Sequence, residues 1–246
     1  MTRSGLIALG LITFLLAGWE GAVRIWAIPV FILPPPSLIL TTAVVQAPLI
    51  LPHAAVTGAE IVLGIVLALA TAIPLAIAMF ARPVLEKALS PILVASQAIP
   101  VFALAPLLVI WLGYGMASKV FMAWIIIFFP ITVSLVQGLK SCDPEYRTLF
   151  TLMGASFLKT LTLLYWPWAL PRFFAGLRVG VSVATIGAVI GEWVGAQQGL
   201  GFLMIQSNAR LQTPLVFAAI LWLAAMGMIL WTLVGILEKK IITWNT

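Results

Sequence analysis

The chain has 246 residues and a net charge of +6, yet only 8% of its residues are charged and 63% are hydrophobic. Soluble domains carry about 25% charged residues, so this composition, with a mean hydropathy of +1.18, excludes a water-soluble globular protein. The lysines and arginines are scattered and form no long block, so the positive charge does not indicate nucleic-acid binding. We therefore expect a protein of the lipid bilayer, all-α and polytopic, with residues 1–246 forming a single transmembrane domain.

Six apolar segments follow one another along the chain, and a spanning helix needs about 20 such residues. The first, after Met1-Thr2-Arg3, resembles a signal peptide but lacks a clear small-x-small cleavage site, so we expect an uncleaved helix. The runs do not alternate residue by residue, which favours helices over the strands of a barrel. The six expected spans cover residues 5–26, 57–81, 89–112, 118–139, 170–193 and 214–237.

The connections between the spans are rich in proline, glycine and charge. Residues 27–56 contain Leu33-Pro34-Pro35-Pro36-Ser37, which cannot be helical through its prolines. Residues 111–118 are expected to form a short loop beside Lys119, and residues 140–169 are the longest polar stretch. Four prolines lie inside expected spans: Pro74, Pro100, Pro106 and Pro130. Each permits a kink, or it simply reflects the frequency of proline in membrane helices.

The distribution of lysine and arginine predicts the orientation of the chain, because these residues are enriched in cytoplasmic loops. With the N-terminus inside, ten of the 13 lie on the inner side and three on the outer side. The inner ten are Arg3, Arg82, Lys87, Lys140, Arg147, Lys159, Arg172, Arg178, Lys239 and Lys240, and the outer three are Arg24, Lys119 and Arg210. The bias predicts six spans with both termini in the cytoplasm.

The inner loop at residues 140–169 carries signals for a short capped helix. Asp143 before Pro144 is typical of an N-cap followed by proline at the first helical position. Glu145 adds negative charge where the helix dipole favours it, and Gly154 is expected to end the helix. Such an element can dock into a groove on a partner, or it can be a plain connection on the membrane surface.

Four sequence elements of this loop and the span after it resemble the cytoplasmic loop of bacterial ABC importer permeases. They are Gly154-Ala155-Ser156, Trp166-Pro167, Ala169-Leu170-Pro171 and Ala175-Gly176-Leu177-Arg178. The E-A-A opening that names the family's loop is replaced here by Thr148, Leu149 and Phe150. The resemblance covers nearly the whole chain, from Trp19-Glu20 to the last helix.

The resemblance implies a type I importer fold in the bacterial inner membrane. Two permease copies, here most simply a homodimer, would form the pathway with a cytoplasmic ABC ATPase dimer and an extracytoplasmic substrate-binding protein. ATP and Mg²⁺ would be bound by the ATPase, because this chain has no G-x-x-x-x-G-K-[ST] sequence. Residues 143–159 would be the coupling helix; the residues expected to engage the ATPase are Asp143, Glu145, Arg147, Phe150, Gly154, Ala155 and Ser156.

Glu192 is the strongest candidate for a functional polar group within the membrane, because a charged residue in a span is costly. The alternative is a carboxylate at the membrane interface that reaches water. Trp193, Gln97 and Asn208 are further candidates along the substrate pathway. The stretch from Gly191 to Thr213 resembles hydroxymethylpyrimidine permeases, which implies uptake of a thiamine precursor; alkanesulfonate, taurine or nitrate uptake is the alternative.

Two other classes fit the sequence less well. A membrane-embedded enzyme needs paired acids, a nucleophile with its base, or metal ligands, and the chain has one histidine, His53, and one cysteine, Cys142. We therefore expect neither catalysis nor a metal or cofactor in this chain. An ion-coupled secondary transporter should show more charge within the membrane and an internal repeat.

Overall fold

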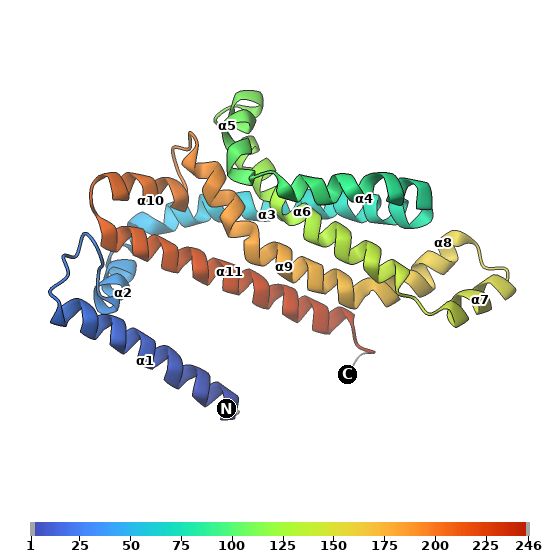
Figure 1. Ribbon diagram of the computed structural model, residues 1–246, viewed down its shortest axis with the longest axis horizontal. Helices are drawn as coiled ribbons and strands as arrows, with labels where there is room; N and C mark the ends of the chain where they lie inside the picture. The colour runs from blue at the N-terminus through green and yellow to red at the C-terminus, as the bar shows by residue number, and fades with distance from the viewer. Residues whose placement is uncertain (1–2, 245–246) are drawn as a thin grey trace. The chain divides into compact units, whose positions relative to one another are not determined.

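The computed structural model describes residues 3–244, and the regular elements in this range are all helices (Figure 1). In chain order they are α1 (Arg3–Ile25), α2 (Pro36–Val45), α3 (Ala47–Ala81), α4 (Pro83–Ala98), α5 (Val101–Leu112), α6 (Met116–Lys140), α7 (Pro144–Leu152), α8 (Phe157–Thr160), the π-helical turn η1 (Leu161–Tyr165), α9 (Trp166–Trp193), α10 (Leu200–Ala209) and α11 (Thr213–Ile241). The expected all-α class is confirmed. The N-terminal Met1-Thr2 lies outside the described residues.

Four helical stretches are long and apolar enough to cross a membrane: Ala47–Ala81, Met116–Lys140, Phe157–Trp193 and Thr213–Ile241. The pair α4 and α5 counts as a fifth span if it is taken together, although the two helices meet at an angle of 98°. The 23 residues of α1 match the first expected span. The fold is therefore that of a polytopic protein with about six transmembrane helices.

The chain divides into two compact units. The first unit comprises residues 3–56 with Gln197–Ala224, and the second comprises Thr57–Ala196 with residues 225–244. In the first unit, the Glu20 carboxylate of α1 accepts hydrogen bonds from Arg24 and from the backbone and hydroxyl of Ser37, at 2.6 to 3.0 Å. These bonds join α1 to the N-terminal end of α2.

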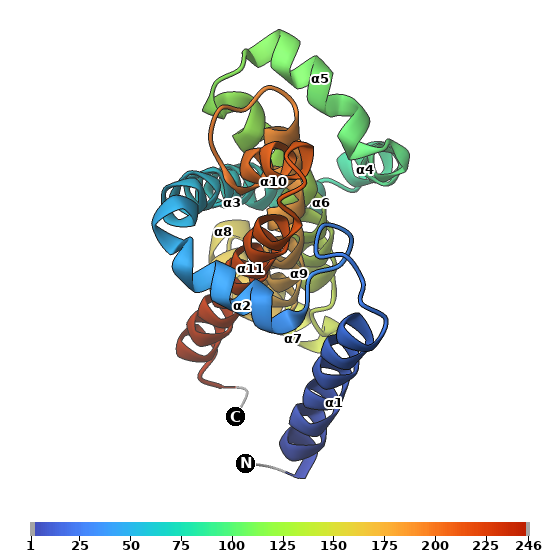
Figure 2. The same ribbon diagram turned by 90° about the vertical axis from the view of Figure 1, so that its left-hand side faces the viewer.

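The core of the second unit is the long contact between α6 and α9, which lie side by side in Figures 1 and 2. Small residues allow the two backbones to approach closely, as is common between membrane helices. A Cβ atom on Gly176 would stand 2.5 Å from Cβ of Ser134 and 2.7 Å from the carbonyl oxygen of Pro130. A Cβ atom on Gly187 would stand 2.8 Å from Cα of Ala123.

Replacing Gly176 with valine is therefore expected to push α6 and α9 apart. Overpacking of this kind typically costs about 1–3 kcal/mol, and the loss should appear as a lower unfolding temperature in detergent micelles. Gly21→Val on α1 is the control, because nothing lies within 4 Å of the Cβ position there. Equal unfolding temperatures for the two variants would contradict this account of the helix contact.

The structure corrects three expectations about the connections. Residues 37–56 were expected outside the helices, yet α2 and the first turns of α3 occupy most of them. Pro36 is compatible with α2 because it stands at the first helical position, where no backbone N–H is needed. The stretch before it, including Leu33 and Pro34, is non-helical as expected.

The expected single span at residues 89–112 is two helices, separated at Ile99-Pro100. Pro100 lacks the N–H that would continue the hydrogen-bond ladder and disfavours helical geometry at the residue before it, so the permitted kink becomes the 98° bend visible in Figure 2. The other prolines inside expected spans, Pro74, Pro106 and Pro130, do not interrupt α3, α5 and α6. The loop expected at residues 111–118 is shorter than predicted, because α5 runs to Leu112 and α6 begins at Met116.

Candidate coupling loop and buried polar cluster

The loop between α6 and α9 contains a short helix with well-defined ends. Asp143 caps α7, because its side chain accepts a hydrogen bond from the backbone N–H of Glu145 at 2.9 Å, and Pro144 occupies the first turn. Gly154 follows the helix at φ +67°, where an L side chain is strained. The N–H of Ala155 then bonds the carbonyl of Phe150 at 3.0 Å. The predicted cap and the glycine stop are both confirmed.

Beyond Gly154, Ser156 caps α8 by accepting a hydrogen bond from the backbone N–H of Lys159 at 3.5 Å. Several large apolar side chains of α7 and α8 are exposed, and Leu152 is the most open of them at 80%. The others are Leu149, Met153, Phe157 and Leu158. A cluster of exposed apolar side chains on a short, capped element is typical of a surface that another protein covers.

The base of this loop is held to the ends of α6 and α9. The Arg147 guanidinium donates to the carbonyls of Lys140 at 3.1 Å and Cys142 at 3.4 Å, and it lies 5.6 Å from the centre of the Tyr165 ring. Trp168 of α9 donates its indole N–H to the carbonyl of Ser141 at 3.1 Å. Displacement of α7 would therefore be transmitted directly to both long helices.

Within this base, Cys142 is buried, and burial raises the pKa of its thiol above the usual range. The side chain therefore stays a neutral thiol at physiological pH.

The residues expected to engage an ATPase differ in exposure. Arg147 points back into its own loop, whereas Glu145, Gly154 and Ser156 are exposed and Asp143, Phe150 and Ala155 are half-buried. Their contact with an ATPase stays a prediction.

A second anchor joins α9 to α11 within the second unit. Arg178, the arginine of the Gly176-Leu177-Arg178 segment, forms an ion pair with Glu238 at 2.5 Å and stacks over the Trp231 ring at 4.9 Å. Gly235 leaves room for the guanidinium, since a Cβ atom there would stand 3.1 Å from its Nη2. The motif residue thus holds the last helix beside the loop-bearing helix α9.

A buried polar cluster lies where α3, α6 and α9 meet. Glu192 is 1% exposed and accepts a hydrogen bond from the Thr57 hydroxyl at 2.6 Å. Glu60 is 3% exposed and lies within hydrogen-bond reach of Glu192, although its Oε2 has no hydrogen-bond partner among the described residues. Lys119 is 2% exposed and donates its ammonium group to the carbonyl of Tyr114 at 2.6 Å.

The burial of Glu192 excludes the alternative of an interfacial carboxylate that reaches water. Two members of the cluster, Glu60 and Lys119, were missed from the sequence. Glu60 could have been found, because it is the only charged residue between His53 and Arg82 and stands inside an expected span. Lys119 stands at the start of the expected span 118–139, but it was counted only as a cation of the outer side.

Trp193 and Gln97, the other predicted pathway residues of the second unit, do not belong to this cluster. Trp193 follows Glu192 in the chain but is half exposed. Gln97 is exposed near the end of α4, where it donates to the Ser96 hydroxyl at 3.4 Å. Asn208 is exposed on α10 in the first unit.

Apolar spanning helices, a capped loop fixed at the ends of two of them, and a buried polar cluster together define a transport protein of the membrane. The chain belongs to the family of binding-protein-dependent transport system inner membrane components, whose model matches residues 60–243. It is therefore the membrane-embedded permease component of an ABC importer, a multi-pass protein of the inner membrane.

Three relatives show the range of transport systems to which the chain is similar. The formylaminopyrimidine transport permease protein ThiX of Halalkalibacterium halodurans is 38% identical over 92% of this chain and 91% of its own length. The riboflavin transport system permease protein RibX of Chloroflexus aurantiacus is 42% identical over 65% of this chain and 60% of its own. The taurine transport system permease protein TauC of Escherichia coli is 29% identical over 100% of this chain and 92% of its own length.

Proposed function

We propose that this chain forms the substrate pathway of an ATP-driven importer for a thiamine pyrimidine precursor of the hydroxymethylpyrimidine type. The observation that carries the substrate is the 38% identity, over nearly the full length of both chains, to a permease named for formylaminopyrimidine transport. The taurine permease is less similar at 29%, which makes taurine or another sulfonate the alternative substrate class.

The proposed assembly contains two copies of this chain, a cytoplasmic ABC ATPase dimer and an extracytoplasmic substrate-binding protein. ATP and Mg²⁺ belong to the ATPase, and both termini of the permease lie on the cytoplasmic side. The exposed apolar side chains of α7 and α8 support docking of this loop into a groove on the ATPase, because helix-in-groove contacts rest on such anchors.

The contacts at the base of the loop suggest how ATP binding would move the helices. Closure of the ATPase dimer would displace α7, and Arg147 and Trp168 would carry this displacement to α6 and α9. Because α9 also bears Glu192, the movement would reach the buried polar cluster. The result is a rigid-body switch between inward-open and outward-open states.

Uptake in cells with and without this chain tests the substrate. We expect labelled hydroxymethylpyrimidine to accumulate only when the chain and a hydrolysis-competent ATPase are both present, while labelled taurine and riboflavin do not. ATP-dependent taurine uptake in place of pyrimidine uptake would keep the importer role and overturn the substrate. A hydrolysis-deficient ATPase is the matched control for each compound.

A further inference from the structure

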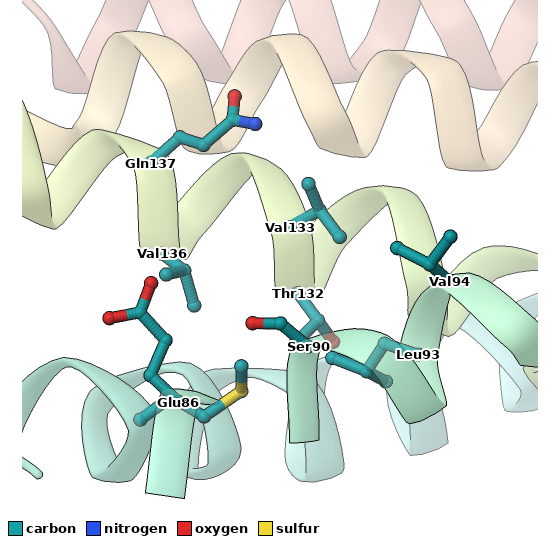
Figure 3. Close-up of a pocket in the computed structure, with 9 residues that line it drawn as sticks. Glu86, Ser90, Leu93, Val94, Thr132, Val133, Val136 and Gln137 are labelled. Atoms are coloured by element: carbon teal, nitrogen blue, oxygen red, sulfur yellow. The ribbon is translucent and has the colours of Figure 1, made fainter. Parts of the chain in front are cut away.

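A small cavity of about 160 Å³ lies within the second unit, between the end of α3, α4 and α6. Figure 3 shows Glu86 and Ser90 on α4 turned toward Thr132 and Val136 on α6. Met79 and Leu93 add apolar surface. The cavity is separate from the polar cluster at Glu192, with which it shares no lining residue.

The volume of the cavity limits what it can hold. A cavity of about 150 Å³ accommodates one benzene ring, so this cavity has room for a single six-membered ring. An entirely apolar cavity of that size would stay dry. The polar groups from Glu86, Ser90 and Thr132 instead suit a ligand with a flat body and a polar edge.

The polar groups favour a ligand that donates hydrogen bonds. The Glu86 carboxylate accepts from the Lys140 ammonium at 2.7 and 3.0 Å, and an ionised carboxylate has about four acceptor positions, so its acceptor capacity is not exhausted. The Thr132 hydroxyl already donates to the carbonyl of Phe128 at 2.8 Å and therefore faces other groups as an acceptor. The lining is thus rich in acceptors.

This chemistry discriminates between the candidate substrates. An aminopyrimidine brings N–H donors on a flat ring, whereas taurine brings a donating ammonium group together with a sulfonate, which has only acceptors and a negative charge that Glu86 would repel. Among the cations near the cavity, Lys140 is already paired with Glu86.

We propose that the cavity is a binding site for a small amino-substituted six-membered heterocycle, with the carboxylate of Glu86 accepting from the amino group. The proposal rests on the proposed function, because it takes the aminopyrimidine as cargo. Positive charge around the cavity, at Arg82, Lys87 and Lys140, places it on the cytoplasmic side by the positive-inside rule. The site is therefore one that the substrate occupies before its release.

Equilibrium binding to the intact importer in lipid nanodiscs, without the binding protein, tests the site. We expect labelled hydroxymethylpyrimidine to bind saturably, and Ser90→Leu, which fills the cavity, to abolish this binding. Thr132→Val keeps the side-chain shape, removes an acceptor and should weaken binding by about threefold to tenfold. Ser182→Leu, at an exposed position on α9, is the control and should bind as the native chain does.

Each outcome decides between the site and the function. Loss of binding in Ser90→Leu and weaker binding in Thr132→Val, with both variants still co-purifying with the ATPase, supports the site. Unchanged binding in both variants overturns it, as does equal affinity for an analogue that lacks the amino group. If cells take up hydroxymethylpyrimidine through this chain while the cavity variants bind normally, only the site fails. If cells take up only taurine, the proposed substrate is wrong, and the proposed site is wrong with it.

Discussion

Replacing Gly154 with tryptophan is expected to abolish ATP-driven uptake and the association of this chain with its ATPase. The residue sits at φ +67°, and holding an L side chain in that region costs about 1–2 kcal/mol. No atom lies within 4 Å of the Cβ position, so the side chain begins in open space. It would instead project from the surface that the ATPase is proposed to cover.

Gly113→Trp is the matched control for this variant. Gly113 also has a positive φ, at +80°, and equally open space around its Cβ position, but it lies in the loop between α5 and α6. Co-purification of the ATPase and substrate uptake are measured for both variants. Survival of both activities in Gly154→Trp, or their equal loss in Gly113→Trp, would count against the coupling role of the loop.

Replacing Lys119 with methionine is expected to be the most destabilising single change in the second unit. It removes the buried cation that interacts electrostatically with Glu60 and Glu192, and breaking a buried charge arrangement typically costs about 3–5 kcal/mol. The unfolding temperature in detergent micelles should fall. It is measured by intrinsic tryptophan fluorescence.

Lys140→Met gives the comparison at an exposed ion pair. Lys140 bonds Glu86 at 2.7 Å with about half of its side chain in solvent, and such pairs contribute about 1 kcal/mol or less. An unfolding temperature for Lys119→Met no lower than for Lys140→Met would show that the buried cluster does not hold α3, α6 and α9 together.

The coupling loop could be predicted from the sequence because its signals are local. Asp143 and Pro144 specify a helix start within two residues, and Gly154 specifies its end through a backbone conformation that glycine adopts readily. The spans that became α3, α6, α9 and α11 were also predictable, since each depends only on a continuous apolar run.

Features that depend on contacts between distant residues could not be predicted in the same way. Glu60, Lys119 and Glu192 lie on three helices, and nothing local in the sequence says that their side chains meet. Pro100 predicted a kink but not its 98° angle, because a proline permits a bend without fixing its size. The helical start of α2 at Pro36 was missed, because a proline run gives no sign of which proline begins a helix.

Cross-linking of α7 to the ATPase tests the central claim most directly. Leu152→Cys introduces a thiol at the most exposed position of the loop's apolar cluster, while the native Cys142 is buried and should stay unreactive. We predict that a bismaleimide joins Leu152→Cys to the ATPase in native membranes, with a yield that changes on addition of ATP, and that Tyr114→Cys in the loop between α5 and α6 gives no such product. A cross-link from Tyr114→Cys but none from Leu152→Cys would contradict the account.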